Sequence, residues 1–73
     1  MNAKYKLIKN SRIIDNTRYI VYGIECYYDN NYYDSFNDIV LNKSEAQEIC
    51  DFLNKHNISP VHFIDIVEDF IAK

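Results

Sequence analysis

Alternation of apolar and polar side chains dominates the first half of the chain and predicts β-strands. The clearest strand spans residues 17–28, where the side chains fall into two alternating sets. We expect one set to face the core, namely Ile20, Tyr22, Ile24, Cys26 and Tyr28. The opposite set is Tyr19, Val21, Gly23, Glu25 and Tyr27.

Two further strands are predicted on either side of this one. Residues 5–14 share its period, and residues 32–41 form a weaker third strand that contains several polar side chains. Asp15 and Asn16 separate the first two strands, and residues 29–31 separate the second from the third. Asp and Asn tolerate the left-handed backbone of tight turns. The sequence therefore predicts two consecutive hairpins.

The second half of the chain changes to the period of an α-helix. We expect its cap at Asn42 paired with Glu45, or at Ser44 paired with Gln47, because both pairs have the spacing of a capping box. The apolar face that follows is Ala46, Ile49, Cys50 and Leu53. Asn57 is expected to end the helix, since Asn accepts the left-handed conformation found after many helices.

A second helix closes the chain. Ser is a preferred N-cap and Pro suits the first helical position, so Ser59 and Pro60 predict its start. Its apolar face is Phe63, Val67, Phe70 and Ile71. The predicted order is β-β-β-α-α, an α+β fold in which residues 1–73 form a single domain. In it, both helices pack on one face of a three-stranded antiparallel meander.

The strand face turned away from the helices carries the first candidate interaction residues, Tyr19, Val21, Gly23 and Tyr27. This face holds more apolar surface than solvent exposure requires, so it is covered by a dimer or another partner, or its apolar residues are simply scattered. Gly23 is the only glycine in the chain and predicts a bulge or a close approach. A slot for a ligand or partner at Gly23 is the alternative.

Charge is distributed unevenly. The net charge is −3, with +3 in residues 1–28 and −6 in residues 29–73. Asp65, Glu68 and Asp69 form an acidic face on the last helix and are the second group of candidate interaction residues. The two halves are either solvated faces of opposite sign or an oriented interface with a charged partner. The basic and aromatic residues near the start resemble a nucleic-acid surface, but the acidic overall charge argues against that partner.

The compartment is predicted from the cysteines and the hydropathy. Cys26 and Cys50 are too few for the disulfide framework of a small secreted domain, so we expect reduced core residues, with a disulfide between them as the alternative. No run of eighteen apolar residues occurs, so no membrane span or membrane partner is predicted. We expect a cytoplasmic protein.

Catalytic chemistry is not predicted. His62, Asp65 and Asp69 are spaced as one stripe of the last helix, but a metal site needs three or four converging ligands, which a single stripe rarely supplies. The serines and cysteines have no evident base beside them, and a chain with one glycine has no glycine-rich phosphate loop. We therefore predict no metal ligand, no cofactor, no catalytic residue and no enzymatic activity.

Three segments resemble a known family: residues 22–24, Asp38-Ile39 and the closing SPVHFIDIVEDF of residues 59–70. They are similar to a family of small bacterial proteins, mostly from Gram-positive Firmicutes, that is classed as a domain of unknown function. The similarity spans almost the whole chain, and the closing helix is its specific part. The resemblance implies a bacterial intracellular setting and supplies no catalytic residues.

These features together predict a small interaction module. We expect it to bind protein, either a second copy of itself or one bacterial partner, through the Tyr-rich sheet face or an edge strand. The alternative is an inhibitor of a host protein, of the kind that phages and mobile elements encode, acting through its acidic helical face.

Overall fold

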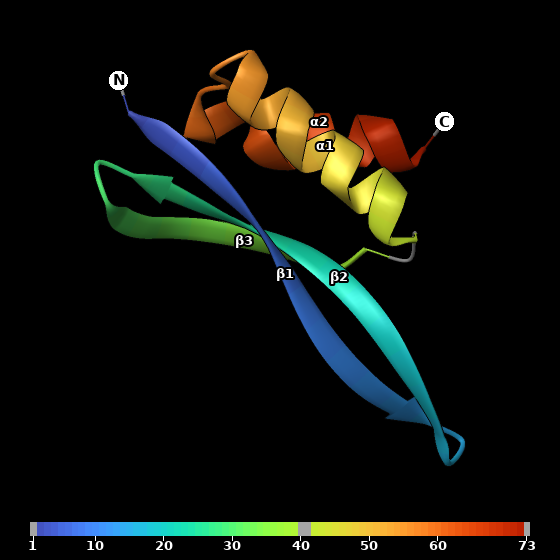
Figure 1. Ribbon diagram of the computed structural model, residues 1–73. Helices are drawn as coiled ribbons and strands as arrows, with labels where there is room; N and C mark the ends of the chain where they lie inside the picture. Colours follow the sequence, from blue (N-terminus) through green and yellow to red (C-terminus); the bar gives the residue numbers. More distant parts are fainter. Residues whose placement is uncertain (1, 40–41, 73) are drawn as a thin grey trace.

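The sheet has three strands that follow one another as an antiparallel meander. In the computed structural model, which describes residues 2–39 and 42–72, the strands are β1 (Ala3–Ile14), β2 (Thr17–Tyr28) and β3 (Asn31–Ile39). β2 lies between the other two (Figure 1). The first strand begins at Ala3 rather than at residue 5, and residues 40–41 of the predicted third strand lie outside the described residues.

Both hairpin turns contain two residues with a left-handed backbone. The φ angles are 51° and 63° at Asp15 and Asn16, and 50° and 67° at Asp29 and Asn30. Two consecutive residues of this kind make a type I′ turn, whose twist matches that of the strands it joins. The turn residues named from the sequence therefore close both hairpins, and that prediction is confirmed.

The first helix, α1 (Lys43–Lys55), begins at an Asn42 N-cap that is paired with Glu45. Asn42 Oδ1 accepts a hydrogen bond of 2.8 Å from the Glu45 backbone N–H, and Asn42 Nδ2 donates one of 2.9 Å to Glu45 Oε1. Of the two predicted caps, the pair that starts at Asn42 is the one formed. Asn57 follows the helix with φ of 49°, as expected of the residue that ends it.

The second helix starts with a tighter turn than predicted. Ser59 occupies the N-cap position and Pro60 the first position, but they open a 3-10 turn, η1 (Pro60–His62), before α2 (Phe63–Ile71). The Ser59 side chain makes no capping bond; its carbonyl accepts from the His62 N–H at 2.9 Å instead. Among the described residues, no helix has the length and apolar composition needed to cross a membrane.

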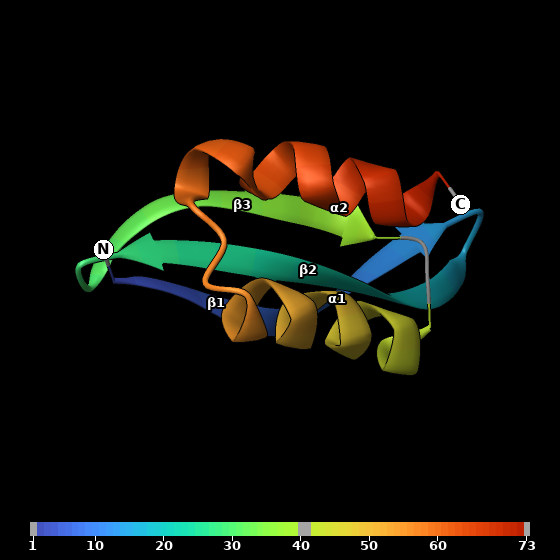
Figure 2. The same cartoon turned by 90° about the horizontal axis from the view of Figure 1, so that it is seen from above.

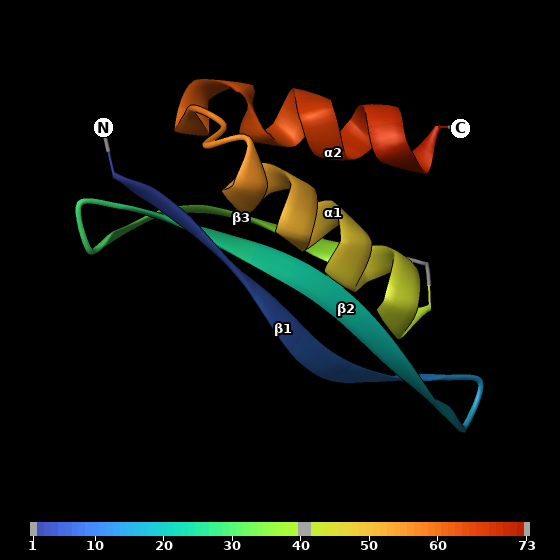
Figure 3. The same cartoon turned by 45° about the horizontal axis from the view of Figure 1, so that its top comes forward.

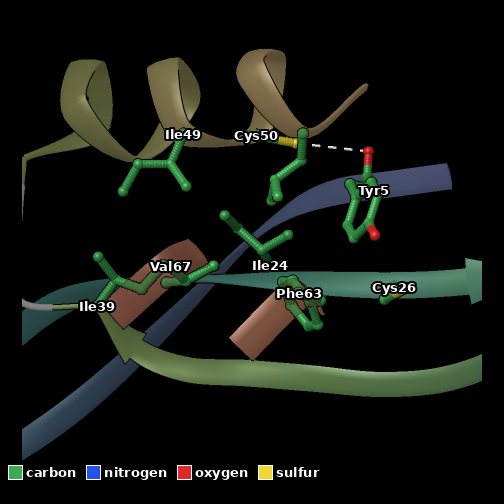
Figure 4. Close-up of a cluster of buried hydrophobic side chains, with 9 residues drawn as sticks. Tyr5, Ile24, Cys26, Ile39, Ile49, Cys50, Phe63 and Val67 are labelled. Atoms are coloured by element: carbon green, nitrogen blue, oxygen red, sulfur yellow. Dashed lines mark hydrogen bonds between the residues drawn. The ribbon is translucent and has the colours of Figure 1, made fainter. Parts of the chain in front are cut away.

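Both helices lie on the same face of the sheet, which we call the helix-side face, and the opposite side is the outer face. Seen from above, α1 runs over the β1 side and α2 over the β3 side, in opposite directions (Figure 2). The α+β fold predicted from the sequence is thus confirmed. The buried core between the layers consists of Tyr5, Ile24, Cys26, Ile39, Ile49, Cys50, Leu53, Phe63 and Val67 (Figure 4).

A side-chain amide of α1 ties this helix to the backbone of the edge strand β1. Asn54 Nδ2 donates to the Tyr5 carbonyl and Asn54 Oδ1 accepts from the Tyr5 N–H, both at 2.9 Å. The Tyr5 hydroxyl donates to the Ile58 carbonyl at 2.7 Å, just beyond α1. One amide therefore supplies both partners that a neighbouring strand would otherwise give to Tyr5.

The hairpin of β1 and β2 continues beyond the helices as a two-stranded arm, residues 9–21 (Figures 1 and 3). Among the described residues, the first of β2 to be paired with β3 is Tyr22, which lies opposite Ile39. The molecule measures 43 × 27 × 17 Å, an elongated shape to which this arm contributes. Both faces of the arm are largely exposed to solvent.

Part of the core predicted from the sequence is wrong, because the helices do not cover the whole of β2. Ile24 and Cys26 are buried as expected and Tyr22 is half-buried, but Ile20 is 47% exposed and Tyr28 is 38% exposed. Alternation identifies the face on which a side chain lies, and not how far the helices reach along it. A 12-residue strand is about 40 Å long, whereas a 13-residue helix spans only about 20 Å. The helices therefore leave both ends of β2 uncovered.

Candidate interaction surface

The outer face collects residues from all three strands. Strand pairing places Lys4 opposite Tyr27 and Lys6 opposite Glu25, and pairs of this kind point to the same side of a sheet. β3 contributes Tyr32, which is paired with Tyr27. Neither helix lies on this side (Figure 3).

Tyr27 is the centre of an ordered group of side chains on the outer face. The Lys6 ammonium lies 4.8 Å from the centroid of the Tyr27 ring, within the range of a cation–π contact. The Tyr32 ring meets Tyr27 edge-on, with centroids 6.0 Å apart and planes at 79°. We call Lys6, Glu25, Tyr27, Tyr32 and Ser35 the Tyr27 cluster.

Hydrogen bonds fix the polar ends of both tyrosines in the Tyr27 cluster. The Tyr27 hydroxyl donates to Glu25 Oε1 at 3.1 Å, and the Tyr32 hydroxyl donates to Ser35 Oγ at 3.0 Å. The bond to the Glu25 carboxylate raises the pKa of Tyr27, because it stabilises the protonated phenol. Tyr32 is nevertheless 58% exposed, so the group is ordered and also accessible to a partner.

The space above Gly23 is occupied. A β-carbon built at this position would lie 2.9 Å from the Phe36 carbonyl oxygen and 3.1 Å from Ile8 Cδ1. The register between β2 and β3 also shifts here, since Tyr22 pairs with Ile39 and Ile24 pairs with Phe36. Gly23 thus marks both an irregularity in the pairing and a close approach. The alternative slot for a ligand is filled by the protein's own side chain.

The four candidate residues of β2 do not form one patch. Tyr19, Val21 and Tyr27 all lie on the outer face as predicted, but Tyr19 is on the arm, paired with Arg12. Eight residues of strand separate Tyr19 from Tyr27, which corresponds to about 26 Å. Tyr27 instead groups with Tyr32 and Lys6, which sequence reasoning did not select. Only the strand register, with its irregularity at Tyr33, brings these residues together.

The acidic candidates lie on the other side of the molecule. Asp65, Glu68 and Asp69 are exposed on α2, which contains no basic residue. His62 belongs to the preceding 3-10 turn. Within residues 2–39 and 42–72, no group of three or more His, Cys, Asp or Glu side chains is placed to hold a metal ion. The acidic half of the sequence is divided between the two layers, since β3 also contains Asp34 and Asp38.

The two thiols are buried in the core. Both Cys26 and Cys50 are free, and Cys50 Sγ lies 3.4 Å from the Tyr5 carbonyl, to which its thiol donates. Burial raises the pKa of the Cys50 thiol to about 11 and also raises the pKa of Cys26. Neutral, buried thiols pack as small apolar groups. The expectation of reduced core cysteines is therefore met.

The fold and this surface define a small α+β protein whose three-stranded sheet is covered by two helices on one face and open on the other. The chain belongs to the family described as "Family of unknown function (DUF6514)", whose model matches residues 1–73. The family resemblance drawn from the sequence is confirmed, and it assigns no role to any residue. No curated protein and no solved structure matches the chain.

Proposed function

We propose that this protein is a non-enzymatic interaction module that binds a protein partner through the Tyr27 cluster on its outer face. One observation carries the proposal: tyrosine rings and a lysine are held in fixed contacts on a sheet face that the helices leave open. Tyr is enriched at protein interfaces because it offers a large apolar surface together with a polar end.

Preorganisation supports binding at this surface. An interface loses free energy when it must immobilise flexible side chains, at about 0.5–1.5 kcal/mol for each one. In the Tyr27 cluster the rings of Tyr27 and Tyr32 already contact each other, and both hydroxyls already have acceptors. A partner therefore meets side chains whose conformations need little further ordering.

Charge indicates the chemistry of the partner. Lys4 and Lys6 lie beside the tyrosines, and Glu25 is partly engaged by the Tyr27 hydroxyl. A partner surface with carboxylates around an apolar centre complements this arrangement, and the complementarity favours its approach in the correct orientation. The free, buried cysteines support a reducing compartment, and we propose that the protein acts in the cytoplasm.

Site-specific crosslinking in the native host tests the proposal. A photoreactive phenylalanine analogue replaces Tyr32, and in a matched control it replaces Val61, which is exposed on the helix layer. We expect one discrete protein adduct from position 32 that is absent from position 61. Adding Tyr27→Ser and Lys6→Glu to the position-32 protein should remove the adduct. The same adducts from both positions, or none from position 32, would contradict the proposal.

The acidic face of α2 supports a second candidate, an inhibitor that occupies a basic site on another protein. The observation in its favour is the exposure of Asp65, Glu68 and Asp69 on a helix without basic residues. The two candidates depend on different surfaces. Glu68→Lys with Asp69→Lys should abolish binding by the acidic face, whereas Tyr27→Ser should leave it unchanged.

A further inference from the structure

The arm presents an unusual amount of uncovered apolar surface. On its helix-side face Ile13 is 70% exposed, and Ile20 lies on the same face past the end of the helix layer. A two-stranded ribbon is marginally stable in water unless something packs against it. In the figures the arm projects away from its own helices, so those helices do not supply the cover (Figures 1 and 3).

The same face of the arm is basic. Lys9 and Arg18 flank the two isoleucines, Ser11 is the remaining side chain there, and no carboxylate shares the face. The surface that fits it therefore combines an apolar contact with negative charge.

Such a surface exists on the same chain, at the end of α2. Ile71 is 37% exposed, and Glu68 precedes it by three residues, a spacing that places both on one side of a helix. Asp65 and Asp69 add negative charge, and the carbonyl end of the helix adds the negative end of its dipole. The arm and α2 are thus complementary in both charge and apolar character.

We propose that a second copy of this chain covers the arm, in a two-fold dimer where the arm of each copy lies on α2 of the other. The arm leaves the helix layer at the end where α2 finishes, so the two complementary surfaces lie near the same end of the molecule (Figure 2). A reciprocal contact covers both arms and closes the assembly, whereas a one-sided contact would leave one arm free and would propagate. The dimer uses the helix-side face and leaves the Tyr27 cluster open, so it does not depend on the proposed function.

Reversing one charge on the arm or one on α2 tests the dimer, and sedimentation velocity measures the result. We expect the parent protein to sediment as a dimer, and Arg18→Glu or Glu68→Lys alone to weaken dimerisation about tenfold or more, since each reversal acts twice in a two-fold interface. Mixing the two single variants should restore a dimer, because each arm then meets an α2 of opposite charge. Lys4→Glu makes the same charge change on the outer face and should leave the dimer intact.

Three outcomes overturn the proposal. The first is a parent protein that stays monomeric even at about 1 mM, where a weak contact would be populated. The second is a mixture of the two single variants that remains monomeric while circular dichroism shows both to be folded. The third is growth of the parent into species larger than a dimer.

Discussion

Replacing Asn54 by Ala tests whether the amide clamp holds α1 on the sheet. The substitution removes two hydrogen bonds of 2.9 Å to the Tyr5 backbone. A typical hydrogen bond contributes about 1 kcal/mol net, and a group left without its partner adds to the loss. Because Asn54 is itself exposed, water reaches part of the site, and Cys50 still donates to the Tyr5 carbonyl. We expect the free energy of unfolding to fall by about 2 kcal/mol.

Urea unfolding followed by far-ultraviolet circular dichroism measures this loss. Gln47→Ala is the matched control, since Gln47 is also an exposed amide of α1 but bonds only to Asp51, one turn away. Such a pair contributes about 0.2–0.5 kcal/mol. Asn54→Asp should be at least as harmful as Asn54→Ala at neutral pH, because a carboxylate cannot donate to the Tyr5 carbonyl. Equal losses from Asn54→Ala and Gln47→Ala would refute the clamp.

Two further predictions concern buried positions, Gly23 of β2 and Cys50 of α1. Gly23→Ala should lower the free energy of unfolding by about 1–3 kcal/mol, which is typical of overpacking, because the added carbon would lie 2.9 Å from the Phe36 carbonyl oxygen. A variant with the same melting temperature as the parent protein would contradict this prediction. The second concerns pH: the pKa of Cys50 is raised from 9.0 to about 11, so the unfolded thiol loses its proton first. Stability should therefore be retained below the unfolded pKa and fall as pH rises toward 11, and Cys50→Ala should flatten that fall in urea titrations.

Local signals in the sequence were sufficient for the elements and their order. The turn residues Asp15 and Asn16 have the left-handed backbone that their chemistry permits, and Asn42 caps the first helix and pairs with Glu45. Each of these features depends on residues within a few positions of one another, which is why spacing alone predicts it. The start of the last helix differs because Ser59 and Pro60 are compatible with a 3-10 turn as well as with an α-helix.

The candidate surface required information that spacing does not contain. The alternation along β2 predicts Tyr27 as an interaction residue, but its neighbours Lys6 and Tyr32 come from β1 and β3. Their position depends on the register of two strand pairs, and a shift of one residue at Tyr33 decides which side Tyr32 occupies. The exposure of Ile20 likewise depends on where the helices end above the sheet.

The mismatch in length between helices and strands explains why the arm is an open surface of the molecule. Two short helices cover one face over part of the sheet, so the core gathers around Tyr5, Ile24 and Phe63 in that part (Figure 4). The arm remains uncovered for this reason, whereas the outer face is open because both helices lie on the helix-side face (Figure 3). Their chemistry differs, however, because the Tyr27 cluster is fixed by internal contacts, whereas the isoleucines of the arm are exposed on a ribbon of two strands. A preformed cluster suits binding with little change in shape, while a marginally stable ribbon gains most from a contact that covers it. The two surfaces therefore support separate roles, recognition of a partner by the cluster and self-association by the arm.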